Sequence, residues 1–168
     1  MQSGGSRGTG RREGSVLIRP ADAREGERLR EIARASKGHW GYAEELVRQW
    51  TDGLDLSPAG LRKKEFYVAE IDGRVVGWSA LLDRGDICWL DDLWVEPDWI
   101  GLGVGTKLFD WAAARGRELG AARMEWEAER HALGFYEKMG GRYLRDSEPG
   151  VWGRVSPIMG IALNSTDR

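Results

Sequence analysis

The first regular pattern of apolar and polar positions predicts a short strand over 15–20 (SVLIRP). A helix is then expected over 21–38, and a second helix over 43–50 after an aromatic bend at 39–42 (HWGY). The apolar positions that support the first helix are Ala23, Leu29, Ile32 and Ala33. Farther on, the pair Ser57-Pro58 resembles the cap and first-turn proline of one more short helix.

Three strands are expected in the middle of the chain. Residues 65–83 (EFYVAEIDGRVVGWSALLD) predict two strands joined at Asp72-Gly73, which is a strong hairpin signal. Residues 85–95 (GDICWLDDLWV) predict a third strand after a second tight turn. Tight hairpins imply that these three strands pair antiparallel.

The second half of the chain alternates helices and strands. A helix is expected from 104 to about 119, with one face formed by Val104, Leu108, Trp111 and Ala112. Residues 122–129 (ARMEWEAE) predict a strand in which apolar residues alternate with Glu125, Glu127 and Glu129. A short helix over 131–140 and two strands, over 141–146 and 153–163, complete the pattern.

This order of elements predicts an α/β (α+β) fold built on one twisted, mixed sheet of six or seven strands. The hairpins make the sheet mostly antiparallel. The passage from 87–95 through the helix to 122–129 is a β-α-β unit, which implies one parallel pair of neighbouring strands. Helices are expected on both faces of the sheet.

Composition narrows the class of protein only slightly. The chain has 168 residues and a formal net charge of -2, which gives no general electrostatic footprint for nucleic acid. No apolar run approaches the length of a membrane span, and the first residues lack an apolar signal-peptide core. We expect a disordered tail over 1–14, a single domain over 15–163 and a C-terminal tail over 164–168. The lone Cys88 excludes a disulfide within the chain, and a reducing cytoplasm fits these observations.

Three glycines stand at the start of the helix expected from 104, in the stretch WIGLGVGTKLFDW (99–111). The unpaired N–H groups of a helix start attract phosphates, and glycines let a pyrophosphate approach the backbone closely. A Walker loop does not fit, because Leu108 follows Lys107 where serine or threonine is needed. A dinucleotide-binding fingerprint does not fit well either, because Thr106 stands where the third glycine belongs.

The stretch DDLWVEPDWIGLGVG resembles the coenzyme A loop of the GNAT superfamily of N-acetyltransferases, V-x-P-x-x-[QR]-G-x-G-[IV]-G. The matching residues are Val95, Pro97, Gly101, Gly103, Val104 and Gly105. A second segment, ALGFYEKMGGR, resembles the A-x-x-F-Y-E-K-x-G-F pattern of the same superfamily through Ala132, Phe135, Tyr136, Glu137, Lys138 and Gly140. Two positions depart from the superfamily: Ile100 replaces Gln or Arg, and His131 stands where Asn is common.

The resemblance covers residues 15–163 and implies an acetyl-CoA-dependent N-acetyltransferase. Such an enzyme transfers an acetyl group to a primary amine, here on an unidentified and small acceptor, by direct attack in a ternary complex. The alternative is a non-catalytic acyl-CoA-binding or sensing module of the same fold. The resemblance places coenzyme A against Leu93, Trp94, Val95, Ile100, Gly101, Leu102, Gly103, Val104, Gly105, Thr106, His131, Phe135 and Tyr136.

Acetyl transfer needs stabilisation of the thioester oxygen, a proton for the leaving thiolate and a neutral amine. The resemblance assigns the first task to backbone N–H groups near Val95, where the strand parts from its neighbour, and the second to Tyr136. The base is predicted to be Asp91 or Glu129, directly or through one ordered water. Because side chains alternate along a strand, only one of Asp91 and Asp92 is expected to face the ligand.

Acceptor recognition is expected at the N-terminal helices and at the loop before the last strand. The candidates are His39, Trp40, Tyr42 and Arg154, with Trp50 and Trp152 near them in the pattern. An aromatic wall with an arginine suits a small, partly apolar amine, including one with a carboxylate. The alternative for these aromatic residues is packing in the core. We expect no metal, no nucleic-acid partner and no membrane, and a homodimer joined through a sheet edge is compatible with the pattern.

Overall fold

The computed structural model describes residues 14–150 and 153–164. The predicted tails, 1–14 and 164–168, lie outside the described residues except for Gly14 and Asn164, and Trp152 lies outside them too. No helix in the described ranges is long and apolar enough to cross a membrane.

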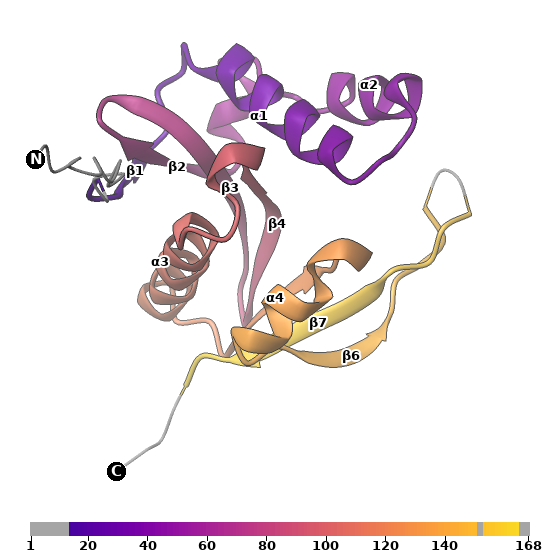
Figure 1. Ribbon diagram of the computed structural model, residues 1–168. Helices are drawn as coiled ribbons and strands as arrows, with labels where there is room; N and C mark the ends of the chain where they lie inside the picture. Colours follow the sequence, from indigo (N-terminus) through magenta and orange to yellow (C-terminus); the bar gives the residue numbers. More distant parts are fainter. Residues whose placement is uncertain (1–13, 151–152, 165–168) are drawn as a thin grey trace, which may run out of the picture.

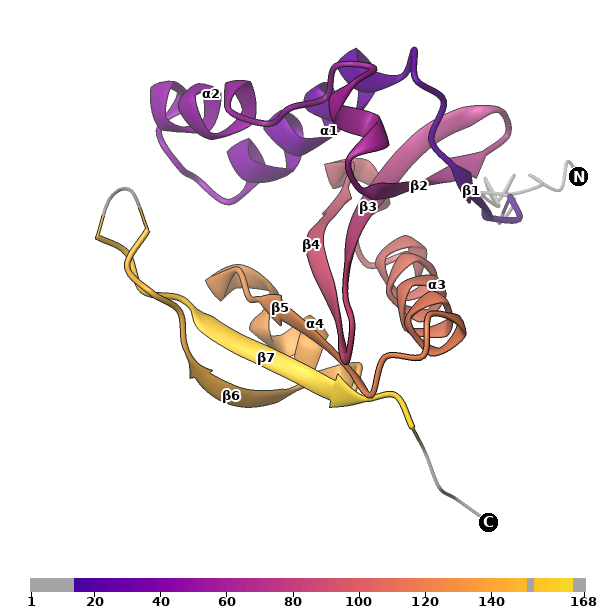
Figure 2. The same cartoon turned by 180° about the vertical axis from the view of Figure 1, so that it is seen from behind.

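Seven strands form one sheet in the order β1-β2-β3-β4-β5-β7-β6 (Figures 1 and 2). The strands are β1 (Leu17–Pro20), β2 (Glu65–Ile71), β3 (Arg74–Arg84), β4 (Ile87–Val95), β5 (Arg123–Glu127), β6 (Arg142–Asp146) and β7 (Pro157–Ala162). Neighbours pair antiparallel except β4 and β5, which pair parallel. The predicted mixed sheet with one β-α-β unit is confirmed.

The α-helices are α1 (Gly26–His39), α2 (Glu44–Asp52), α3 (Val104–Glu118) and α4 (Leu133–Lys138). Three 3₁₀ turns, η1 (Gly60–Arg62), η2 (Pro97–Trp99) and η3 (Arg130–Ala132), precede β2, α3 and α4. The Gly60 N–H donates to the Ser57 hydroxyl over 3.0 Å, as the predicted cap would, but the turn η1 itself begins later, with Ala59 as its N-cap residue. Asp72 and Gly73 close the β2–β3 hairpin with φ of 49° and 79°, as a tight turn of this kind requires.

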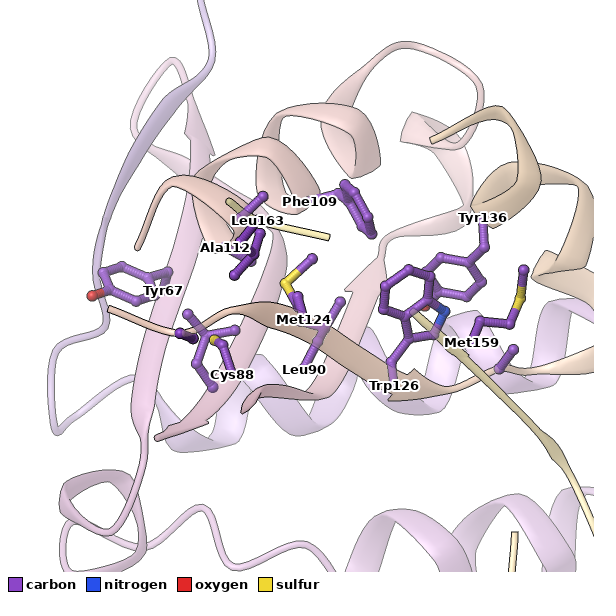
Figure 3. Packing of buried hydrophobic residues seen from close by; sticks show 14 residues of the cluster. Tyr67, Cys88, Leu90, Phe109, Ala112, Met124, Trp126, Tyr136, Met159 and Leu163 are labelled. Atoms are coloured by element: carbon purple, nitrogen blue, oxygen red, sulfur yellow. The ribbon is translucent and has the colours of Figure 1, made fainter. Parts of the chain in front are cut away.

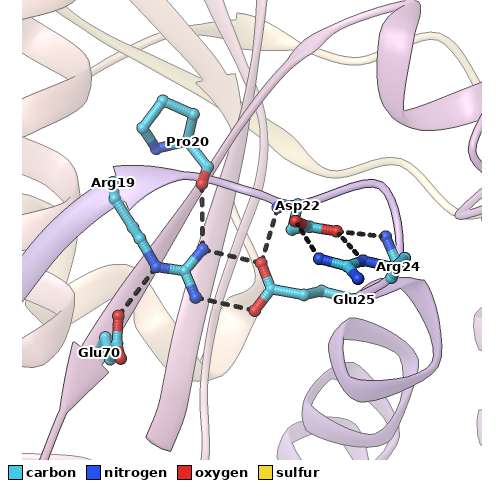
Figure 4. Close-up of polar contacts among 6 residues, drawn as sticks. All are labelled: Arg19, Pro20, Asp22, Arg24, Glu25 and Glu70. Atoms are coloured by element: carbon cyan, nitrogen blue, oxygen red, sulfur yellow. Dashed lines mark hydrogen bonds and ion pairs between the residues drawn. The ribbon is translucent and has the colours of Figure 1, made fainter. Parts of the chain in front are cut away.

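Helix α1 begins later than the pattern predicted, so Ala23 is exposed and lies outside it. The polar side chains around Asp22 explain this, because they hydrogen-bond the local backbone in place of a helical turn. Asp22 accepts from the Arg24 N–H over 2.8 Å, and Glu25 accepts from the Asp22 N–H over 2.7 Å. Arg19 then ties Glu25 to Glu70 on β2, which anchors the start of α1 to the sheet (Figure 4).

The helices cover both faces of the sheet. On one face α1 packs against β3, where Leu29, Ile32 and Trp78 are fully buried. On the other face α3 and α4 pack on β4 and β5, with Phe109 and Trp126 edge to face at 5.2 Å (Figure 3). One position of the predicted α3 face, Trp111, was wrong.

Trp111 is 40% exposed, so it does not belong to the buried face of α3. The other three predicted positions, Val104, Leu108 and Ala112, are buried as expected, and Phe109 is a core-facing position that was not predicted. Trp111 packs beside Tyr67 of β2, with the two rings 5.7 Å apart. The broad tryptophan side chain therefore covers the margin of the core without entering it.

The sheet divides where β4 and β5 meet. These two strands pair only over Ile87, Cys88 and Trp89 of β4, and they diverge beyond Trp89. Figures 1 and 2 show the result as two arms: β1–β4 with α1, α2 and α3 form one, and β5–β7 with α4 form the other. The edge of β4 from Leu90 to Val95 is left without a strand partner on its β5 side.

Candidate active site

A cleft of about 1170 Å³ opens where the two arms part. Its lining comes from β4, the glycine loop (residues 100–105), α4, the end of α1 and the segment before β7. The predicted site residues among its lining are Trp40, Asp91, Leu93, Trp94, Val95, Ile100, Gly101, Gly103, Gly105, Thr106, Glu129, His131, Phe135, Tyr136 and Arg154. Residues far apart in the sequence are thus brought to one cavity.

Four predicted site residues do not line this cleft. Leu102 is 54% exposed and Val104 is buried in the core against Leu108, so neither side chain reaches it. Their predicted coenzyme contact is restricted to backbone N–H groups. His39 is exposed and packs edge-on against Trp40, while Tyr42 lies behind the lining and contacts Glu129.

A β-bulge on β4 changes which side chains face the cleft. The register pairs Ala80 with Asp92 and Leu81 with Leu90, so Asp91 is an extra residue without a partner. The bulge breaks the alternation, and both Asp91 and Asp92 line the cleft. The expectation that only one of them would face the ligand side was therefore wrong.

The two aspartates have different surroundings. The ammonium group of Lys64 and the Trp89 indole N–H both bind the Asp91 carboxylate. Asp92 receives only the Trp94 indole N–H, over 3.1 Å, among the described residues. Burial, followed by the negative charge of Asp91, raises the pKa of Asp92 to about 7.

Asp92 is therefore the carboxylate whose protonation state changes near neutral pH, and the sequence pattern did not select it. Asp91 and Asp92 are adjacent in a strand-like run. The alternation of side chains along a strand does not show that Lys64, which precedes β2, pairs with Asp91 and not with Asp92. A local signal was present in Trp94, whose indole N–H reaches back two residues to Asp92.

Tyr136 lies on α4 and reaches the same cleft, although only 7% of its surface is exposed. Its ring packs 5.0 Å from that of Trp126 on β5. Burial, aided by the charges of Asp92 and Glu129, raises the pKa of the Tyr136 hydroxyl well above its ordinary value. The hydroxyl therefore keeps its proton at neutral pH.

The glycine loop leads directly into α3. Gly101 and Gly103 have φ of 79° and 88°, a left-handed conformation that side chains disfavour, and Gly103 is the N-cap of the helix. No atom lies within 4 Å of a β-carbon built at either residue, so open space adjoins the loop. This space and the unpaired N–H groups of the first turn of α3 suit a pyrophosphate.

A different role is evident for Gly105. A β-carbon there would lie 3.4 Å from Phe135 on α4 and 3.7 Å from Val95 on β4. The absence of a side chain lets the start of α3 pack closely against both β4 and α4.

A cluster of aromatic and charged residues surrounds Glu129, and we call it the acceptor wall after the role predicted for part of it. It consists of Lys37, Trp40, Tyr42, Trp50, Glu129, His131 and Arg154, all of which except Tyr42 line the cleft. Glu129 is its centre: it accepts from the Lys37 ammonium over 2.7 Å and from the Tyr42 hydroxyl over 2.6 Å. Burial alone would raise the pKa of Glu129, but these hydrogen bonds outweigh it and lower the pKa. A carboxylate so occupied is a poor proton acceptor, so the structure argues against Glu129 as the base.

Aromatic rings join the two arms in the acceptor wall. Trp40, which follows α1, stacks on His131 of η3 with ring centroids 5.2 Å apart and an interplanar angle of 2°. The Lys37 ammonium lies 4.5 Å from the centre of the Trp50 ring, and the Arg154 guanidinium lies 5.6 Å from the centre of the Tyr42 ring. Trp50 and Glu129 were predicted separately and Lys37 was not predicted, because the Lys37–Glu129 contact that brings the three together joins residues 92 apart in the sequence.

Comparison with known proteins identifies the class. Residues 27–141 match the model of the acetyltransferase (GNAT) family, which is more than half of the chain. The chain belongs to this family of acetyltransferases. It is also similar to an uncharacterized N-acetyltransferase of Methanocaldococcus jannaschii, with 28% identity over 86 residues that cover 45% of this chain. The match spans only 38% of that relative's length.

Solved structures show the same fold. The PaiA N-acetyltransferase of Thermoplasma acidophilum in complex with coenzyme A is similar at a TM-score of 0.75 and 21% identity, over 88% of this chain and 99% of that one. YncA, a putative acetyltransferase of Salmonella typhimurium with acetyl-CoA, is similar at a TM-score of 0.65 and 20% identity. That match covers 92% of this chain and 97% of the YncA chain. The predicted fold class and family resemblance are confirmed.

Proposed function

We propose that the chain transfers the acetyl group of acetyl-CoA to a primary amine of a small-molecule acceptor, by direct attack in a ternary complex. One observation carries this proposal: a single cleft is lined by the glycine loop, by Asp92 and Tyr136, and by the acceptor wall. Donor and acceptor can therefore be bound together. The open space beside Gly101 and Gly103 fits the pyrophosphate of coenzyme A.

Acetyl-CoA supplies an activated thioester carbonyl. Backbone N–H groups on the unpaired edge of β4 near Val95 are proposed to donate to the thioester oxygen as it gains charge. These groups are fixed by the sheet before the reaction begins, so little reorganisation is needed when charge develops.

Asp92 is proposed as the base, in place of Asp91 and Glu129. As the amine nitrogen bonds to the carbonyl carbon, Asp92 takes the amine proton, directly or through one water. A pKa of about 7 leaves a large share of its carboxylate ionised at neutral pH. Tyr136 is proposed to give its hydroxyl proton to the sulfur as the carbon–sulfur bond breaks, and to regain a proton from solvent.

The test is thiol release from acetyl-CoA with a panel of amines, measured for the wild type and for Tyr136→Phe. Loss of one hydroxyl should lower kcat and kcat/KM together by about 10² to 10⁴, because the proton is transferred only in the transition state. Acetyl-CoA binding, measured by calorimetry, should stay within about twofold because the ring still fills the same space.

The alternatives give different results. Coenzyme A binding without thiol release for any amine would support a non-catalytic acyl-CoA-binding module. If the kcat of Tyr136→Phe is less than about threefold lower than that of the wild type, Tyr136 is not the acid. A loss of binding as large as the loss of kcat would make its hydroxyl a coenzyme contact.

A further inference from the structure

Resting on the proposed function, we propose that the acceptor is an amine that carries a carboxylate on a flat apolar body. Arg154, supported by Lys37, binds the carboxylate, while Trp40 and Trp50 contact the apolar body. The acceptor wall is then a specificity site for aromatic amino acids and amines of similar chemistry.

The charge of the acceptor wall supports an anionic group. Lys37 and Arg154 contribute two positive charges, and the described residues of the wall contain one carboxylate, Glu129, to balance them. Both oxygens of Glu129 are already bound, by Lys37 and Tyr42. One positive charge of the wall is therefore left for a ligand.

Arg154 is the group placed to use that charge. It is exposed, lines the cleft, and no carboxylate of the described residues lies within ion-pair distance of it. Its guanidinium lies over the rings of Tyr42 and Trp50, at 5.6 and 5.9 Å from their centres. Stacking of this kind restricts the guanidinium plane while leaving N–H groups at its edge, which suits bidentate binding of a carboxylate.

The apolar body of the acceptor follows from the neighbouring indoles. Trp40 and Trp50 both line the cleft. Trp40 already holds one flat ring, that of His131, in a parallel stack at 5.2 Å. Aromatic side chains favour offset stacking on other flat rings, so an aromatic acceptor fits this wall better than a branched or fully polar one.

A second cation on the acceptor is disfavoured by the same contacts. The carboxylates that line the cleft are Asp91, Asp92, Glu127 and Glu129. Lys64 neutralises Asp91 and Lys37 neutralises Glu129, Asp92 is the proposed base for the reacting amine, and Glu127 forms no ion pair with a described residue but lies outside the acceptor wall. The wall would present Lys37 and Arg154 to a second ammonium group. Polyamines are therefore expected to be poor acceptors.

The experiment compares amines that differ only by the carboxylate. Thiol release is measured with L-tryptophan and tryptamine, with L-phenylalanine and 2-phenylethylamine, and with spermidine. The variants are wild type, Arg154→Gln and Arg142→Gln. Arg142 is a matched control because it is an exposed arginine on β6 that forms no ion pair with a described residue and lies outside this cleft.

We expect wild type to prefer each amino acid over its decarboxylated analogue in kcat/KM. Arg154→Gln should lower kcat/KM for the amino acids by about ten- to a hundredfold, the usual worth of a hydrogen bond to a charged group. It should change the values for tryptamine and 2-phenylethylamine by less than about threefold. Because the comparison is a ratio between variants, the different basicities of the amines cancel. Arg142→Gln should change neither class.

A binding measurement separates this proposal from the proposed function. N-acetyl-L-tryptophan is titrated by calorimetry into wild type and Arg154→Gln, each saturated with coenzyme A. Weaker binding to Arg154→Gln supports the carboxylate site even if no amine is turned over, in which case the proposed function alone fails. Equal losses for both classes of amine, preference for tryptamine or spermidine, or no Arg154-dependent binding would overturn the inference.

Discussion

At the scale of single residues, the β-bulge at Asp91 is the feature that decides the chemistry of the cleft. An unbroken strand would turn one of the two aspartates toward α3 and the core. The extra residue turns both toward the cleft, where Asp91 is held by Lys64 and Asp92 is not. A bulge of this kind is a device for directing a side chain into a site.

Asp92→Asn is predicted to lower activity and to raise stability above neutral pH. Burial raises the pKa of Asp92 to about 7, against about 3.9 in the unfolded chain. The folded state then binds the Asp92 proton more tightly, so the contribution of Asp92 to stability is fully present below about pH 4 and is lost as pH rises through 7. Asparagine removes this loss, which is on the order of a few kcal/mol.

The measurements are urea unfolding at pH 5 and pH 8, and kcat/KM across the same range. We expect Asp92→Asn to be more stable than wild type at pH 8, with a much smaller difference at pH 5, and kcat to fall by about 10² to 10⁴. Asp91→Asn is the neighbouring control: it relieves the repulsion that helps raise the pKa of Asp92 but loses the Lys64 ion pair, so it should gain much less stability at pH 8 than Asp92→Asn. If the kcat of Asp92→Asn equals that of the wild type, Asp92 is not the base.

At the scale of elements, the junction between the glycine loop and α3 combines two requirements. The backbone must turn through a left-handed conformation at Gly101 and Gly103, and the N–H groups of the next turn must stay accessible. The left-handed turn and the accessible N–H groups both come from one short stretch of the chain, so the sequence alone predicts them.

Gly103→Val is predicted to weaken coenzyme A binding strongly. Its φ of 88° is unfavourable for a β-branched residue, and the side chain would enter the open space proposed for the pyrophosphate. Gly85→Val is the matched control, because Gly85 has a φ of 75° and open space around it but lies in the β3–β4 turn outside the cleft.

Both variants should lose a similar amount of stability in urea unfolding, about 1–2 kcal/mol. Only Gly103→Val should raise the calorimetric Kd for coenzyme A, by tenfold or more. Equal coenzyme affinity in the two folded variants would mean that Gly103 serves only the turn.

Features that depend on neighbouring residues were predictable from the sequence, whereas features that depend on contacts between distant residues were not. The Asp72-Gly73 hairpin, the glycine loop and the parallel β4–β5 pair were predictable because each depends on a short stretch or on element order. The late start of α1 was not predicted, because the hydrogen bonds around Asp22 compete with a helical turn that the apolar spacing allows.

The acceptor wall shows the opposite case. Glu129 was predicted as a base from its place on one face of the strand expected over 122–129, but its partner Lys37 comes from a helix 92 residues earlier. No spacing rule connects the two, and only the folded arrangement shows that the carboxylate is occupied. Asp92 was passed over for the same reason, since the Lys64 contact that distinguishes Asp91 comes from another part of the chain.

At the scale of the whole molecule, the two arms are held together at one end and meet again across the cleft. Pairing of β4 with β5 joins them at the base, where the core of Figure 3 is continuous. Lys37 with Glu129, and Trp40 with His131, join them at the acceptor wall. The sheet ends in β1 and β6, and assembly of two copies through either edge stays a prediction.

Coenzyme A is predicted to raise the melting temperature of the protein, because a ligand bound between the arms adds contacts that only the folded state can make. Glycine-loop N–H groups belong to the first arm, and Phe135 and Tyr136 belong to the second, so one molecule would contact both. Binding to the folded state alone adds about 2.7 kcal/mol when the free ligand is at a hundred times its Kd. For a domain of this size that corresponds to a shift of several degrees.

ATP and NAD at the same concentration are the controls, since each carries phosphates on an adenine nucleotide but lacks the pantetheine arm that would follow the unpaired edge of β4. The expected result is a shift with coenzyme A that follows its concentration logarithmically and is much smaller with either nucleotide. A shift of equal size with ATP would mean that phosphate binding at α3 acts alone, without a contribution from the parted strands. No shift with millimolar coenzyme A would contradict the proposed donor site itself, because the open space at the glycine loop would then hold no pyrophosphate.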